Sequence, residues 1–198
     1  MKKGKGIMAD TLRSEYDLKS LPVRRLGPGR KSFGGSMTRL VPEELLLDFF
    51  LTFSRFEFAL KNSGFYVKKR KTSLPYEATP DWDSFAQHLK NAFHADATPR
   101  LRDACDHLLN NPPAREIVGA GALGWDATAE NKSLSEIEQL LRYVRRIRNN
   151  LFHGGKFSNL AGLETDRNVA LLEDSLVILR ECLRLTDNVR QQYESAAL

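Results

Sequence analysis

The stretch SLSEIEQLLRYVRRIRNNLFHGG, residues 133–155, carries the clearest structural signal in this chain. Ser133, followed three positions later by Glu136, fits a capping box that begins a helix, and Gly154 with Gly155 ends it directly after His153. Apolar residues recur between these ends at intervals of three and four: Leu134, Ile137, Leu140, Leu141, Val144, Ile147 and Leu151. This period predicts an amphipathic helix with one buried face.

Four other segments show the same helical period, and proline, glycine or a capping residue marks their ends. We expect these helices to begin at Pro42, at Thr79 with Pro80, at Thr98 with Pro99 and at about Thr165, with the last running to about Ser195. Gly64 is suited to end the first of them. Between residues 115 and 125 we expect only a short extended piece or a hairpin. The pattern predicts an all-α bundle of about five helices, because each apolar stripe must be buried against another helix.

The chain divides by charge into two regions. Residues 1–40 carry ten Lys and Arg against three Asp and Glu and show little periodic hydrophobicity, whereas residues 41–198 have a net charge of −2. We therefore expect a basic, flexible and loosely ordered N-terminal extension over 1–40 and one helical domain over 41–198. The extension can bind RNA or DNA through phosphates, or it can be simply solvated.

Composition excludes several classes of protein. The longest apolar run is far shorter than the roughly 20 residues that span a bilayer, and no apolar segment follows the basic start of the chain as a secretion signal requires. We therefore expect a cytoplasmic protein without membrane contact. Cys105 and Cys182 lie far apart, without histidine at metal-ligand spacing, so we expect buried reduced thiols and neither a zinc site nor a disulfide scaffold. We also expect no metal and no cofactor.

Weaker motifs do not change this interpretation. Residues 119–124 fit G-x-G-x-x-G but lack the strand and helix that a dinucleotide site requires. Residues 68–71, Lys-Lys-Arg-Lys, are read as a solvated loop, with phosphate contact as the alternative. The remaining histidines, His88, His94 and His107, are read as structural.

The polar side of the helix over 133–155 holds the candidate site. At about 100° per residue, one stripe carries the residues Arg142, Arg145, Arg146, Asn149 and His153. Arg148 falls apart from them at the border of the buried face, where a guanidinium needs a partner. That partner can be a carboxylate such as Glu57, a substrate phosphate, or both.

Two interpretations follow from these positions. In the structural one, Arg148 is a satisfied salt bridge, Asn149 and His153 cap the helix end, and the other arginines form a solvated face. In the functional one, arginine and asparagine hold a phosphate while histidine, whose ordinary pKa is about 6.5, moves a proton at neutral pH.

The run Arg148-Asn149-Asn150-Leu151-Phe152-His153 resembles the R-N-x-x-x-H form of the R-x4-6-H signature of HEPN domains (higher eukaryote and prokaryote nucleotide-binding). Gly154-Gly155-Lys156 and the upstream run 55–61, with Gly64-Phe65, are also similar to a bacterial branch of this superfamily. The resemblance spans residues 41–193 and implies a helical bundle that pairs as a homodimer.

Many members of that family are metal-independent ribonucleases of toxin–antitoxin, abortive-infection or CRISPR systems. The resemblance thus implies that Arg148 and His153 are catalytic, with Asn149 orienting them, and that RNA is the substrate. Arg142, Arg145, Arg146 and Lys156 would hold the flanking RNA backbone. A cognate antitoxin or another defence protein would be a further partner. The alternative is a non-catalytic HEPN module that binds RNA, a nucleotide or a partner protein.

Overall fold

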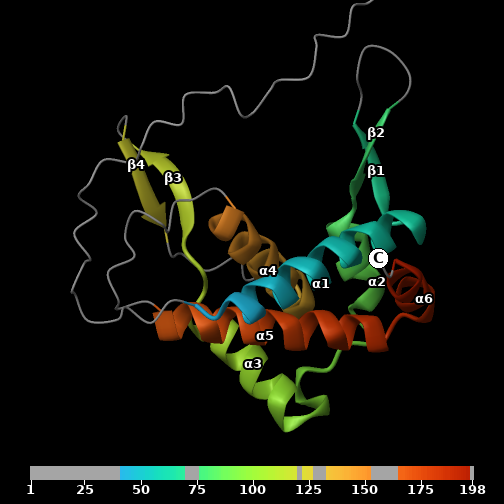
Figure 1. Ribbon diagram of the computed structural model, residues 1–198. Helices are drawn as coiled ribbons and strands as arrows, with labels where there is room; N and C mark the ends of the chain where they lie inside the picture. The colour runs from blue at the N-terminus through green and yellow to red at the C-terminus, as the bar shows by residue number, and fades with distance from the viewer. Residues whose placement is uncertain (1–40, 70–75, 120–121, 127–132, 153–164, 197–198) are drawn as a thin grey trace, which may run out of the picture. The chain divides into compact units, whose positions relative to one another are not determined.

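The computed structural model describes residues 41–69, 76–119, 122–126, 133–152 and 165–196, all of which belong to one compact unit, Met37–Leu198. These ranges hold six α-helices: α1 (Glu43–Asn62), α2 (Trp82–Leu89), α3 (Pro99–Asn110), α4 (Glu136–Phe152), α5 (Thr165–Arg184) and α6 (Asp187–Ser195) (Figure 1). A short 3-10 helix, η1 (Ala95–Ala97), precedes α3. The predicted helical bundle is thus confirmed, while the expectation for residues 1–40 lies outside the described ranges.

Two small antiparallel hairpins accompany the helices. Strand β1 (Tyr66–Lys69) pairs with β2 (Glu77–Pro80), and β3 (Arg115–Gly119) pairs with β4 (Ala122–Asp126). The second hairpin was expected from the sequence. The first was not, because residues 68–71 are expected to form a solvated loop and Thr79 with Pro80 to begin a helix. This pairing places Val67 opposite Thr79, which lies three residues before the first residue of α2.

The first helix shows how local sequence sets element ends. Glu43 and Glu44 occupy the first turn of α1, where their negative charges stabilise the helix by interacting with the positive end of its dipole. Gly64 follows the last turn with φ 90°, a left-handed conformation that glycine adopts without strain. The predicted start and end of this helix are therefore confirmed to within about one residue.

An aromatic cluster joins α1 to α2. The ring of Phe56 stacks on Trp82 with a centroid distance of 5.3 Å, and Phe85 meets Phe56 edge to face at 5.5 Å. All three side chains are buried, and such pairs are worth about 0.5–1.5 kcal/mol each beyond the burial of their area. The cluster fixes α2 against α1 and thereby positions the start of α2.

The remaining core follows the predicted stripes of α3, α4 and α5. Its buried members include Leu101, Cys105, Leu108, Ile137, Leu140, Leu141, Val144, Ile147, Leu172, Leu176, Leu179 and Cys182. Both cysteines are buried and free, as predicted, and burial raises the pKa of Cys105 to about 12. None of the helices in the described ranges is long and apolar enough to cross a membrane.

Three helix boundaries differ from the prediction. Thr79 and Pro80 belong to β2, and Asp81 caps α2 instead, because its carboxylate accepts hydrogen bonds from the backbone N–H and the hydroxyl of Ser84. The hydrogen bond from the backbone N–H of Ser84 is the main reason why the pKa of Asp81 is lowered. The predicted fifth helix is two helices, α5 and α6, since Thr186 is extended and its hydroxyl donates to the carbonyl of Cys182.

The third difference concerns α4. The predicted capping pair Ser133 and Glu136 is wrong by two residues, because Glu138 accepts from both the backbone N–H and the hydroxyl of Ser135. The carbonyl of Ser135 also accepts the first hydrogen bond of the helix, from Gln139. The shift leaves the apolar face of α4 as predicted, since boundaries do not alter its period.

One buried carboxylate joins α3 to α5. The side chain of Asp174 is 5% exposed, and its oxygens lie 2.5 Å from Nδ1 of His107 and 3.3 Å from Nη1 of Arg100. A buried charge needs such partners, so this contact gives His107 a structural part in the packing of α3 on α5.

Candidate functional site

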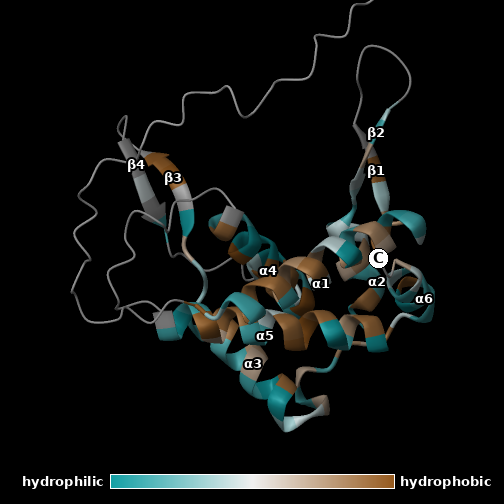
Figure 2. Ribbon diagram, in the orientation of Figure 1, coloured by the Kyte–Doolittle hydropathy of each residue, from teal (hydrophilic) through white to brown (hydrophobic). Residues whose placement is uncertain are grey.

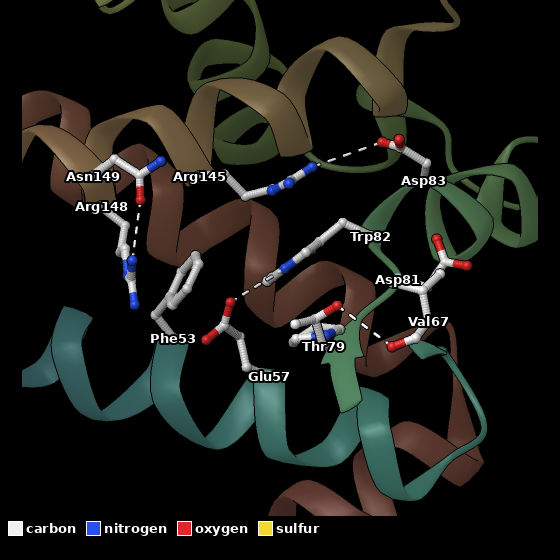
Figure 3. A pocket seen from close by; sticks show the side chains of 11 residues that line it. Phe53, Glu57, Val67, Thr79, Asp81, Trp82, Asp83, Arg145, Arg148 and Asn149 are labelled. Atoms are coloured by element: carbon white, nitrogen blue, oxygen red, sulfur yellow. Dashed lines mark hydrogen bonds and ion pairs between the residues drawn. The ribbon is translucent and has the colours of Figure 1, made fainter. Parts of the chain in front are cut away.

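A pocket of about 600 Å³ opens where the hairpin β1–β2, α1, the start of α2 and the end of α4 meet. We call it the Arg148 pocket. Its lining comprises Phe53, Glu57, Val67, Thr79, Pro80, Asp81, Trp82, Asp83, Arg145, Arg148 and Asn149 (Figure 3). Four residues of the predicted site, Glu57, Arg145, Arg148 and Asn149, therefore converge on one cavity.

Arg148 is half-buried at the edge of the core, the position that the period of α4 predicts. Its Nη1 donates to Oδ1 of Asn149 at 3.1 Å, and its guanidinium lies 5.6 Å from the centre of the Phe53 ring. The ring face attracts the cation and the amide oxygen accepts from it, so two neighbours orient the group.

Glu57 lies across the pocket from the end of α4 (Figure 3). Its Oε1 accepts a hydrogen bond of 3.4 Å from the indole N–H of Trp82, which itself is buried. A smaller cavity of about 210 Å³, here the side pocket, is lined by Phe50, Phe53, Ser54, Glu57 and Arg148. Glu57 and Arg148 thus share the linings of both cavities, and the predicted support of Arg148 by Glu57 stays a prediction.

The other predicted arginines separate into two groups. Arg145 and Arg142 turn toward α2, where their guanidinium nitrogens lie 3.7 and 3.9 Å from Oδ1 of Asp83. Arg146 lies elsewhere, because its Nη1 donates to the carbonyl of Pro113 at 2.9 Å, before β3. The polar stripe predicted for α4 therefore contacts two different parts of the chain, α2 and the segment before β3. Arg146 contacts the second of these and does not line the Arg148 pocket.

Two predicted residues, His153 and Lys156, lie outside the described ranges. His153 is the residue after Phe152, with which α4 ends. Within the described ranges, no cluster of three or more His, Cys, Asp or Glu side chains could hold a metal ion.

The carboxylates at the start of α2 were missed as site residues. Asp81 and Asp83 line the Arg148 pocket at the end away from Arg148 and Asn149 (Figure 3). Their position depends on the aromatic contact of Trp82 with α1, which is a long-range feature. A sequence signal for Asp81 did exist, because an aspartate three residues before Ser84 fits a helix cap.

The pocket can bind an anion at one end and a hydrogen-bond donor at the other. Arg148 and Asn149 supply a guanidinium and an amide, whereas Asp81 and Asp83 supply carboxylates. Comparison with known protein families, with curated proteins and with solved structures finds no match for this chain. The residues of this pocket and the sequence motif that begins at Arg148 are therefore the basis for a functional proposal.

Proposed function

We propose that this chain is a metal-independent endoribonuclease of the HEPN type that acts as a cytoplasmic homodimer. The observation that supports it best is Arg148, half-buried in the lining of an open pocket, five residues before His153. A guanidinium carries five N–H donors in a planar fork that matches a phosphate group. We further propose a toxin or antiphage defence effector, with an antitoxin or another defence protein as partner.

The reaction needs two tasks from these residues. The 2′-hydroxyl oxygen of RNA attacks the adjacent phosphorus, the bond to the 5′-oxygen breaks, and the products end in a 2′,3′-cyclic phosphate and a 5′-hydroxyl. His153 would take the proton of the 2′-hydroxyl and return a proton to the leaving 5′-oxygen. Arg148 would stabilise the charge that develops on the phosphate oxygens, a contribution that is often worth about 10²–10³ in rate.

The neighbours of Arg148 have supporting tasks in this proposal. Asn149 would hold the guanidinium orientation through the 3.1 Å bond from Arg148, and Glu57 would brace the opposite wall. Arg142 and Arg145, released from Asp83, would bind flanking phosphates, as would Lys156 and, farther from the pocket, Arg146.

Cleavage of a labelled single-stranded RNA in EDTA tests the proposal. The full chain should give 2′,3′-cyclic phosphate ends, while His153→Ala and Arg148→Ala should each lose about 100-fold or more in rate. Arg148→Lys should fall between, because it keeps the charge and loses the fork. Arg102→Ala removes an exposed arginine of α3 and serves as the matched control, with activity close to that of the parent chain.

Two results would overturn the assignment. Equal cleavage by the parent chain, His153→Ala and Arg148→Ala would place the activity elsewhere. RNA could instead stay intact and bind in a salt-sensitive manner, with weaker binding by Arg148→Ala. That result would establish a non-catalytic module that binds RNA in the same pocket without cleaving it.

A further inference from the structure

Helix α1 exposes an apolar stripe on the side away from the core. The stripe comprises Leu47, Phe50, Leu51, Ser54 and Phe58, and the four large side chains are 55%, 44%, 37% and 42% exposed in chain order. Intervals of three, four and seven residues place all five on one side of a helix. Figure 2 shows hydrophobic positions along α1. A continuous exposed stripe of this kind is typical of a protein interaction surface.

The stripe complements itself when two copies of α1 lie antiparallel. A two-fold axis between Thr52 and Phe53 places Leu47 opposite Phe58 of a second copy. The same axis places Leu51 opposite Ser54 of the second copy, so a large side chain meets a small one. Both pairs recur on the other side of the axis, as an isologous contact requires. Alternation of large and small residues allows two helices to approach closely.

Charge at the helix ends favours the same arrangement. Glu44 lies exposed in the first turn of α1 and Lys61 lies in the last turn, and the axis that pairs the apolar residues sets them opposite each other. The contact thus places opposite charges at the same level at each of its ends, on its two flanks. A parallel arrangement would instead face Glu44 with Glu44 and Lys61 with Lys61, which repel.

The stripe also borders the candidate site. Phe50 and Ser54 belong both to the stripe and to the lining of the side pocket, which they share with Arg148. A second copy seated on the stripe would therefore cover the mouth of the side pocket and bring its own α1 beside Arg148.

We propose that the apolar stripe of α1 is the surface through which two copies of this chain pair, with the two α1 helices antiparallel. The homodimer is part of the proposed function, and this inference rests on that function because it names the contact surface of the same homodimer. Its test uses no RNA, so a failure of pairing and a failure of cleavage are separate results.

The mass of the full chain in solution, from light scattering or sedimentation over about 1–50 μM, is the first measurement. The parent chain should be a dimer, and Leu47→Glu should weaken the dimer about 100-fold or more, because a charge then lies in each half of the contact. Val118→Glu is the matched control, since Val118 on β3 is 74% exposed and lies off the stripe. It should leave the dimer unchanged.

A charge exchange tests the register without touching the apolar residues. Glu44→Lys and Lys61→Glu should each weaken the dimer about tenfold, because two attractive pairs become two repulsive ones. The double variant should return to within about threefold of the parent chain, since its pairs are attractive again. Circular dichroism confirms that each variant is folded.

Three results would overturn the inference. A monomeric parent chain would mean that the stripe meets another segment or another protein. A dimer unaffected by Leu47→Glu would place the contact on a different surface. Additive loss in the double charge variant would exclude the antiparallel register.

Discussion

The contact between His107 and Asp174 allows a test of how burial decides the cost of removing either partner of a buried carboxylate. The carboxylate is 5% exposed, whereas the side chains of His107 and Arg100 are 31% and 55% exposed. Removing the histidine therefore leaves a buried charge with one remaining partner. Removing the aspartate leaves an arginine and a histidine that water can reach. We expect the two changes to have unequal effects on the free energy of unfolding.

The magnitudes follow from this asymmetry. Loss of one partner from a buried pair costs about 3–5 kcal/mol, and Arg100 still lies 3.3 Å from the other oxygen of Asp174. We therefore expect about 3 kcal/mol for His107→Ala. Asp174→Leu should cost about 1 kcal/mol or less, since an apolar side chain of similar volume often replaces a buried ion pair without loss. The double variant should be about 2 kcal/mol more stable than His107→Ala alone.

Urea denaturation at a fixed protein concentration measures these differences, and thermal melting should show a drop of about 6–12 °C for His107→Ala in a domain of this size. A second substitution that restores stability is an unusual outcome for a core position. If Asp174→Leu is at least as destabilising as His107→Ala, or if the double variant is the least stable of the three, the carboxylate is not a buried charge that depends on His107.

Three further changes test local features in the same urea series. Asp81→Ala should cost about 1 kcal/mol at pH 7, and Asp81→Asn much less. The carboxylate pKa is lowered from its usual 3.8, mainly by the backbone N–H of Ser84, so its stabilisation exists above that value and disappears as the pH falls through the folded pKa. The gap between the parent chain and Asp81→Ala should thus shrink as the pH is lowered from 7 to below 3.8. Gly64→Ala should cost about 1 kcal/mol from its φ of 90°, with Gly64→Asn milder. Thr186→Val should cost about 1 kcal/mol by removing the 2.6 Å bond to Cys182, and an unchanged midpoint would show that this bond does not stabilise the break between α5 and α6.

Periodic features were predictable from the sequence, because they depend on residues three and four apart. The buried face of α4 and the border position of Arg148 follow from the helical period and required no tertiary information. The capping pair failed because two overlapping S-x-x-E patterns compete, one from Ser133 and one from Ser135, and local sequence does not rank them. The break between α5 and α6 falls at Thr186, whose backbone is extended, and weak helix propensities cannot foresee its position.

The Arg148 pocket could be predicted only in part. The wall that α4 contributes follows from the sequence of one helix. The opposing wall combines residues of α1, of a hairpin with four-residue strands and of the cap of α2. Short strands have little periodicity to detect, and the approach of Trp82 to Glu57 spans 25 residues. Asp83 was therefore missed as the neighbour of Arg142 and Arg145.

The charges of the Arg148 pocket link the two proposals. Its described lining holds two guanidinium groups and three carboxylates, so it does not by itself form a strongly basic groove for RNA. In Figure 3, Arg148 and Asn149 lie at one end and Asp81 and Asp83 at the other, where Arg145 pairs with Asp83, and this leaves the Arg148 end suited to phosphate. Binding a longer RNA backbone then requires cations from beyond this lining. Lys156 in the same chain is one source, and a second copy across α1, seated beside Arg148, is another. The Arg148 pocket of an isolated protomer should on these grounds hold a longer RNA weakly, which favours pairing as part of the proposed activity.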